Sequence, residues 1–255
     1  MKRAFLFAGR CLRELLREPL SYIFCLGFPL VMLALMTAIN SMIPAGTMTL
    51  FNIDNLSAGI AVFALSFVML FATLSVSKDR SGAFLTRLFS SPMSATDFIV
   101  GYTLPLLVIS IGQFAVTFIC SGIIGAINGT PLSLTGILLC CLSLLPIALF
   151  FIGIGVLFGS LFSERSAPPC CSIIISVCGV LGGIWFDVSI IPESNPLSII
   201  CRALPFAHAT AVGRTLITGS GEPVWADLLI CSAWALAAWV GAVLAFRSRM
   251  KGDAK

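Results

Sequence analysis

Few residues in this chain of 255 residues are of a type and spacing that could do chemistry. His208 is the only histidine, which excludes a multi-histidine metal site. No GxxxxGK[ST] sequence occurs, which excludes ATP hydrolysis by a P-loop. We therefore expect no catalytic, cofactor-binding or metal site, and we expect that this chain is not an enzyme. For His208 we favour a structural or interfacial role over a proton relay.

The ten cysteines raise the question of a disulfide framework or a metal site. No CxxC pair and no Cys/His metal spacing is present. We interpret the cysteines as small apolar packing residues, because most lie within apolar runs: Cys25, Cys120, Cys140, Cys141, Cys170, Cys171, Cys178 and Cys231.

Charge in the middle of the chain concentrates in residues 78–97, KDRSGAFLTRLFSSPMSATD. Arg80 and Arg87 lie off the apolar face of this segment, and Ser94 with Asp97 forms a capping box for the next helix. The apolar face has the spacing of a helix and consists of Phe84, Leu85, Leu88 and Phe89. We therefore predict a short amphipathic helix between two membrane spans, and we interpret it as an element that transmits force from another subunit.

The composition predicts an all-helical polytopic membrane protein. Hydrophobic residues make up 58% of the chain, charged residues 10%, and the mean hydropathy is +1.07. A soluble domain carries about 25% charged residues. We expect one transmembrane domain, residues 1–255, in which Pro29 interrupts the first span and Pro105 kinks the third. Six spans are predicted, at about residues 20–43, 56–76, 98–127, 134–162, 170–186 and 225–246.

The first 19 residues predict an amphipathic helix that precedes the first span. Its two sides are Phe5, Ala8, Leu12, Leu15 and Leu16 against Arg3, Arg10, Arg13, Glu14 and Arg17. A basic amphipathic helix before a span typically lies in the headgroup layer of the membrane. A signal for orientation is the other interpretation, and the two are compatible.

Residues 187–222 form a different kind of segment. They are too polar to span a membrane, yet residues 199–217 are too apolar for a solvated loop. Three prolines divide the segment: Pro192, Pro196 and Pro205. We expect one or two short re-entrant helices in the outer face of the membrane, which is tolerated only where they pack on protein.

Positive charge is distributed unequally between the two sides. Of the fifteen Lys and Arg residues, all but Arg202 and Arg214 lie in the segments 1–19, 77–97, 163–169 and 247–255. Cytoplasmic loops carry such an excess. We therefore expect a multi-pass protein of the cell membrane, the inner or plasma membrane, with both termini in the cytoplasm.

The interiors of the predicted spans contain no Asp, Glu, Lys, Arg or His. Ionisable groups inside the membrane mark the pathways of ion-coupled pumps, so their absence counts against an ion-coupled secondary transporter. Gly155 and Gly159 have the GxxxG spacing that permits close helix approach. They could serve a dimer contact or packing within the subunit.

Two stretches resemble the membrane (permease) subunits of type-2 ABC exporters, the bacterial ABC-2-type transporter permease family. They are KDRSGAFLTRLFSSPMSATDFIVGY, residues 78–102, and LPFAHATAVGRTLITG, residues 204–219. The resemblance implies that the first is a cytoplasmic coupling segment, in which Lys78, Asp79, Arg80, Gly82, Phe84, Leu85, Arg87 and Leu88 serve contact with an ATPase. The second carries an outer pattern to which Pro205, His208 and Arg214 belong. Members often have a Glu-Arg or Arg-Glu pair where this chain has Lys78-Asp79-Arg80.

The resemblance also implies partners. These are two copies of a separate cytoplasmic ABC ATPase, which carries the ATP and Mg²⁺, and a second permease chain in a homodimer or heterodimer. Membrane lipid surrounds the assembly, and we expect no contact with nucleic acid. This chain itself would hold no cofactor.

We therefore expect a permease that exports a substrate when its partner hydrolyses ATP. Because the spans lack fixed charges, a small hydrophilic ion would lose its hydration with nothing to replace it. We expect an amphipathic, lipid-like or lipid-linked substrate. A membrane anchor or assembly protein without transport is the alternative, although it would not need the amphipathic segment, and an ion-coupled transporter is less favoured.

Overall fold

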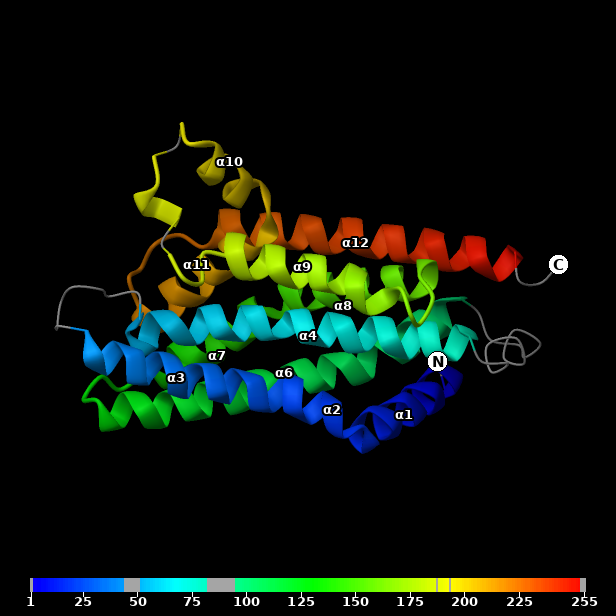
Figure 1. Cartoon of the computed structure of the whole chain (residues 1–255), viewed down its shortest axis with the longest axis horizontal. Helices are drawn as coiled ribbons and strands as arrows, with labels where there is room; N and C mark the ends of the chain where they lie inside the picture. The colour runs from blue at the N-terminus through cyan, green and yellow to red at the C-terminus, as the bar shows by residue number, and fades with distance from the viewer. Residues whose placement is uncertain (1, 44–50, 82–94, 187, 193, 253–255) are drawn as a thin grey trace.

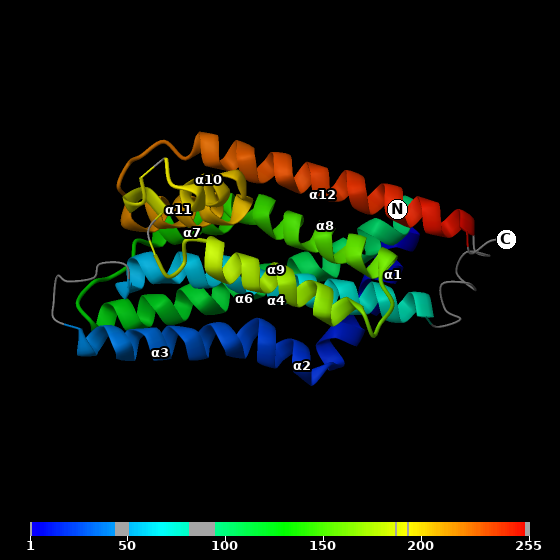
Figure 2. The same ribbon diagram turned by 45° about the horizontal axis from the view of Figure 1, so that its top comes forward.

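The computed structural model describes residues 2–43, 51–81, 95–186, 188–192 and 194–252. In these residues every regular element is a helix, as the sequence predicts. The long helices lie side by side and form one elongated bundle (Figures 1 and 2). Large apolar side chains remain exposed along the outer helices, for example Ile119, Leu236 and Leu244. This is the surface that a helix needs where lipid, and not water, is the solvent.

Helix α4, Ile53–Ser81, is the centre of the bundle. It packs against α8 (Leu145–Leu161), α6 (Ala95–Ile127) and α9 (Ala167–Leu181). Small residues of α4, among them Ala58, Ala61 and Ala72, are fully buried. Small residues let helix backbones approach closely inside a membrane, where no hydrophobic effect drives helices together.

The closest approach is between α4 and α8. A Cβ atom added to Gly155 would lie 2.4 Å from Cβ of Ala72, and one added to Gly159 would lie 2.6 Å from Cβ of Val76. Real Cβ atoms do not approach so closely, so only glycine fits at either position. In this structure the GxxxG pair therefore faces α4 of its own subunit.

The first span is continuous but not uniform. It consists of α2 (Pro19–Tyr22), a π-helical turn (Ile23–Gly27) and α3 (Phe28–Met42). Pro29 has no N–H to donate to the carbonyl four residues earlier, which lies in the π-helical turn. The interruption expected at Pro29 thus takes the form of a π-helical turn. Pro105, by contrast, lies inside an unbroken α6.

The predicted fourth span is two helices. The first is α7, Leu134–Ser143, and the second is α8. The break falls at Leu144, directly before the first turn of α8, which contains Pro146. The prediction of a single span did not take Pro146 into account. Proline has no N–H, which favours the start of a helix at this point.

Within the described residues, five helical stretches are long and apolar enough to cross a membrane: Pro19–Met42, Ile53–Ser81, Thr96–Ile127, Leu134–Leu161 and Trp225–Phe246. The last lies within α12, Trp225–Gly252. Helix α9, which corresponds to the predicted fifth span, is apolar but has only 15 residues. At 1.5 Å per residue it is about 22 Å long, less than the roughly 30 Å hydrocarbon core. The predicted count of six spans is therefore not confirmed by helix length.

Helix α1, Lys2–Arg17, lies against α6. Its buried side differs from the predicted one, because Phe7 and Cys11 are buried whereas Phe5 and Leu16 are exposed. The buried face of α1 is rotated about the helix axis toward Arg10. The Arg10 side chain donates a hydrogen bond to Asp79 on α4. The apolar arc of α1 is thus divided between contact with α6 and an outward-facing edge.

The segment between α9 and α12 holds two short helices beyond a 3₁₀ turn (Val188–Ile190). Helix α10, Pro196–Ala203, projects from the bundle, whereas α11, Pro205–Thr218, lies against it (Figure 1). Helix α11 packs on α4, α12 and α7. Both ends of the described chain lie at the opposite end of the bundle from these helices (Figure 1).

Candidate functional site

The candidate site is the end of the bundle where the predicted coupling segment begins. We call it the α1 end, and it comprises α1, the last turn of α4, the first turns of α6 and the turn between α8 and α9. The three charged residues that open the predicted segment all lie in the last turns of α4: Lys78, Asp79 and Arg80. They point to three different neighbours, so they do not form one cluster.

Asp79 is the residue that joins most elements. The hydroxyl of Tyr102, on α6, donates a hydrogen bond of 2.7 Å to Oδ2 of Asp79. The guanidinium of Arg10, on α1, donates to Oδ1 at 3.3 Å. The Asp79 side chain is only 12% exposed. One carboxylate therefore ties α1, α4 and α6 together.

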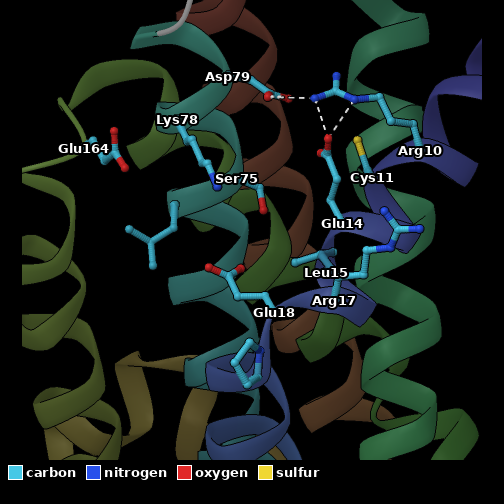
Figure 3. Close-up of a pocket in the computed structure, with 12 residues that line it drawn as sticks. Arg10, Cys11, Glu14, Leu15, Arg17, Glu18, Ser75, Lys78, Asp79 and Glu164 are labelled. Atoms are coloured by element: carbon cyan, nitrogen blue, oxygen red, sulfur yellow. Dashed lines mark hydrogen bonds and ion pairs between the residues drawn. The ribbon is translucent and has the colours of Figure 1, made fainter.

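Arg10 shares its charge between two carboxylates (Figure 3). Its Nη2 lies 2.8 Å from Oε1 of Glu14, one turn further along α1, in addition to the contact with Asp79. Partial burial disfavours the charged guanidinium, but Asp79 and Glu14 outweigh this effect and raise the pKa of Arg10. Arg10 is therefore a permanent cation in this cluster.

Aromatic packing reinforces the same junction. The Phe7 ring meets Tyr102 edge-on, with ring centroids 5.0 Å apart, and Phe98 at 5.6 Å. A Cβ atom on Gly101 would collide with the Phe7 ring, so glycine is required for this approach. Phe98 in turn contacts Phe246 of α12. The hydrogen bonds around Asp79 thus rest on a packed aromatic cluster.

Arg80 points away from α1 and toward α8. Its guanidinium donates to the backbone carbonyls of Ser160 and Phe162, at the C-terminal end of α8. A cation is favourable there because the last carbonyls of a helix lack partners and carry partial negative charge. Beside it, the Ser81 hydroxyl donates to Glu164 at 3.3 Å. Arg80, which the resemblance assigns to the ATPase contact, is half-buried against α8.

The remaining predicted coupling residues cannot be placed. Gly82, Phe84, Leu85, Arg87 and Leu88 all lie outside the described residues. What the structure does place is the base of that segment, which is fixed to α1, α6 and α8. The arrangement can transmit a displacement from the end of α4 to its neighbours.

The three predicted residues of the outer segment lie on α11 and face different neighbours. Nδ1 of His208 lies 2.5 Å from Oδ1 of Asp227, on α12, and Nε2 lies 2.7 Å from the carbonyl oxygen of Arg202, on α10. Both partner atoms are acceptors, so both ring nitrogens donate only in the imidazolium form. The hydrogen bond that His208 donates to the Asp227 carboxylate is the main cause that raises the pKa of His208. His208 therefore holds α10, α11 and α12 together.

Arg214 points to the other side of α11. It donates hydrogen bonds of 3.2 Å to the carbonyl oxygens of Asn55, at the start of α4, and Ile184, after α9. Pro205 is buried at the first turn of α11. His208 and Arg214 thus act at separate junctions, and the structure does not bring them together.

Sequence reasoning missed two members of the α1 end. Arg10 was assigned only to the polar side of α1, and Tyr102 only to the end of a motif. A signal was available for Tyr102, because the chain contains just two tyrosines and a buried phenol needs a hydrogen-bond partner. No spacing rule could have paired Arg10 with Asp79, which are 69 positions apart.

Other chemistry is not supported by the described residues. Among them, no group of three or more His, Cys, Asp or Glu residues is placed to hold a metal ion. All ten cysteines lie in the described part of the chain, and all are free thiols. Burial raises the pKa of the Cys11 thiol at the α1 end to about 12, so it stays protonated and unreactive.

Comparison with known families gives one match. Residues 45–244 match the family described as "ABC-2 family transporter protein", which covers well over half of the chain. The matched stretch includes α4, α6 and α11, but not α1. No curated protein matches this chain.

Proposed function

Since the chain belongs to the ABC-2 transporter family, we propose that it is the permease subunit of an exporter driven by a separate ATPase. The main support is the α1 end, where Asp79 and Arg80 fasten the base of the predicted coupling segment to α1, α6 and α8. An anchor without transport has no need for such a junction. The membrane character of the chain agrees with five long apolar helices.

The junction supplies a mechanism for coupling. An ATPase bound to residues 82–94 would push or pull on the end of α4. Because Asp79 is held by Arg10 and Tyr102, this displacement moves α1 and α6 together with α4. The bonds of Arg80 extend the motion to α8. Interfaces packed in this way switch between arrangements and do not deform continuously.

The pathway is proposed to lie between two permease chains, as a homodimer or heterodimer with two ATPase copies. The described spans carry no charged side chain between Arg17 and Lys78 or between Asp97 and Glu164 except Glu18 and Asp54, which lie at span ends. A path with such walls would not replace the hydration of a small ion. We therefore propose export of an amphipathic, lipid-like or lipid-linked substrate, with its apolar part in the membrane.

The test is reconstitution of the chain with its ATPase in lipid vesicles. Phe84→Asp or Leu88→Asp places an unpaired charge in the proposed ATPase groove and should reduce export at least about tenfold, because burying such a charge costs more than the roughly 1.4 kcal/mol that a tenfold change requires. ATP hydrolysis would persist without export or the complex would weaken. Arg87→Ala, at the proposed rim, should be milder and more sensitive to salt.

Two results would contradict the proposal. Full export by the Phe84→Asp and Leu88→Asp variants would reduce the segment to a membrane-surface element. Stimulation of hydrolysis by small ions or free sugars, with no response to amphipathic compounds, would exclude the proposed substrate class. If no compound crosses the bilayer while the complex still forms, the anchor alternative is favoured.

We also propose that α9 completes a sixth crossing, with both termini in the cytoplasm. Because both ends of the described chain lie at one end of the bundle, the number of crossings must be even (Figure 1). Residues 182–184, which follow α9, are buried, and the carbonyl of Ile184 accepts a hydrogen bond from Arg214. Non-helical backbone is tolerated in a membrane where protein satisfies it in this way.

Cysteine labelling tests this topology in a background without native cysteines. Arg165→Cys, before α9, should be protected from a membrane-impermeant thiol reagent applied outside intact cells. Glu222→Cys, after α11, and Asn128→Cys should react. Equal reactivity at positions 165 and 222 would mean that α9 does not cross.

A further inference from the structure

A pocket at the α1 end has no role in the coupling proposal. It has a volume of about 550 Å³ and lies between the end of α1, the start of α2 and the last turns of α4 (Figure 3). This volume is in the range of small-molecule sites. Because Pro19 opens the first membrane span, the pocket lies at the level where the chain enters the membrane.

The walls of the pocket have an apolar part and a charged part. Leu15, Pro19 and Leu74 provide an apolar part, and Lys78, Arg17 and Glu18 provide a charged part. In Figure 3, Lys78 on α4 and Glu18 at the α1–α2 junction reach toward the same space. Such a pocket fits a ligand that has both a charged head and an apolar tail.

The charges of the pocket are balanced but not internally paired. Arg10 is engaged with Glu14 and Asp79, which leaves Lys78 and Arg17 as cations and Glu18 and Glu164 as carboxylates. Within the described part of the chain, none of these four side chains forms an ion pair with another. A purely anionic ligand would face two carboxylates and a purely cationic one would face Lys78 and Arg17. A zwitterion satisfies both signs.

The kind of cation can also be argued. A quaternary ammonium group is typically held by a cage of aromatic rings, and none of the described residues that line this pocket is aromatic. A primary ammonium, by contrast, donates hydrogen bonds to carboxylates such as Glu18 and Glu164. Lys78 and Arg17 suit a phosphate.

We propose that this pocket binds the headgroup of a phosphatidylethanolamine-type lipid from the leaflet in which α1 lies. The phosphate is held by Lys78 and Arg17, and the ammonium by Glu18 and Glu164. The acyl chains pass Leu15 and Leu74 into the membrane. The bound lipid adds a second link between α1 and α4 beside the Arg10–Asp79 ion pair. This lipid is a resident ligand and not the exported substrate, so the site does not depend on transport.

Native mass spectrometry of the delipidated full-length chain tests the proposal. Phosphatidylethanolamine, phosphatidylcholine and phosphatidylglycerol with identical acyl chains are titrated separately. We expect the first to bind about tenfold more tightly than the other two, the effect of one charge-assisted hydrogen bond. Glu18→Gln should abolish this preference, whereas Lys78→Gln, which removes a phosphate contact common to all three lipids, should weaken the binding of each. Arg13→Gln, an exposed residue of α1 that does not line the pocket, should retain it.

Several outcomes would overturn the assignment. Preference for phosphatidylglycerol would make the site anion-selective, and equal binding of all three lipids would leave only nonspecific annular lipid. A preference that survives Glu18→Gln, binding that is unchanged in Lys78→Gln, or a preference that is lost in Arg13→Gln as well would place the lipid elsewhere. If a variant does not fold, a photoreactive phosphatidylethanolamine on the wild-type chain decides. Labelling of the α1–α2 junction or the end of α4 supports the pocket, and labelling confined to other segments refutes it.

Discussion

At each end of the bundle a carboxylate bonds to side chains of neighbouring helices, but the two carboxylates have different partners. At the α1 end, Asp79 is held by Arg10 and Tyr102. At the other end, which we call the α11 end (α10, α11 and the start of α12), Asp227 faces His208. An arginine keeps its charge at any physiological pH, whereas a histidine titrates near neutrality. The first junction is therefore permanent and the second depends on pH.

The ends also differ in how they satisfy the backbone. The α11 end is built from short helices and irregular chain, which leave carbonyls without helical partners. Side chains of three residues donate to such carbonyls: Arg214 to Asn55 and Ile184, His208 to Arg202, and Trp234 to Ala203. At the α1 end, Arg80 donates to the last carbonyls of α8, and Ser21 and Tyr22 donate to the last carbonyls of α1. These contacts complete the ends of long helices, whereas those at the α11 end hold short helices and irregular chain.

The largest effect is expected from Asp79→Ala, which removes the acceptor shared by three helices. The variant leaves Arg10 and the Tyr102 hydroxyl without this partner, and breaking a largely buried pair in this way should cost about 2–4 kcal/mol. The free energy of unfolding in detergent measures the loss. Glu14→Gln is the matched control because it removes the exposed partner of the same arginine, and it should cost under about 1 kcal/mol. Equal losses in the two variants would mean that Asp79 does not join the helices.

A smaller loss is expected from Gly159→Ala, in the seam of α4 and α8 that connects the two ends. The new methyl group would lie 2.6 Å from Cβ of Val76 and 2.8 Å from the carbonyl oxygen of Thr73. Such overpacking costs about 1–3 kcal/mol. Gly112→Ala on α6 is the control, since nothing lies within 4 Å of its added Cβ. That variant should be neutral or more stable by up to about 1 kcal/mol, because alanine favours a helix. Thermal unfolding of both variants decides whether the seam tolerates a methyl group.

Sequence predicted the elements that depend on composition alone. Long apolar runs predict most of the helices. For example, the predicted span 98–127 corresponds to helix α6, Ala95–Ile127. Helix α4 extends beyond the predicted span 56–76, because it continues through Lys78 to Ser81. Hydropathy reports where the apolar part ends, but a helix continues as long as its backbone bonds and packing are favourable.

Contacts between segments that are distant along the chain could not be predicted from the sequence. The pattern of α1 identifies an apolar arc but not which part of it packs, so Phe5 was chosen where Phe7 is buried. The pairing of Asp79 with Arg10 and Tyr102 depends on how α1 and α6 are placed around α4, which no local spacing encodes. Likewise, no local spacing predicts that Lys78 and Glu18 line one pocket, the proposed lipid site.

The smallest effect concerns the pH dependence of the α11 end. The hydrogen bond that His208 donates to Asp227 raises the pKa of His208. The imidazolium is therefore favoured over the neutral imidazole more strongly in the folded chain than in the unfolded one. Its contribution is complete below the unfolded pKa of about 6.5 and is lost as the pH rises through the folded pKa. His208→Gln, which cannot donate to both acceptors from a charged ring, should cost about 1 kcal/mol at pH 5.5 and less at pH 9. Thermal unfolding of both chains across this range measures the gap, with Thr218→Val on the same helix as a control that should show no such trend. A gap that stays constant with pH would mean that His208 is not an imidazolium in the folded chain, and the contrast between the two ends would then be one of geometry and not of charge.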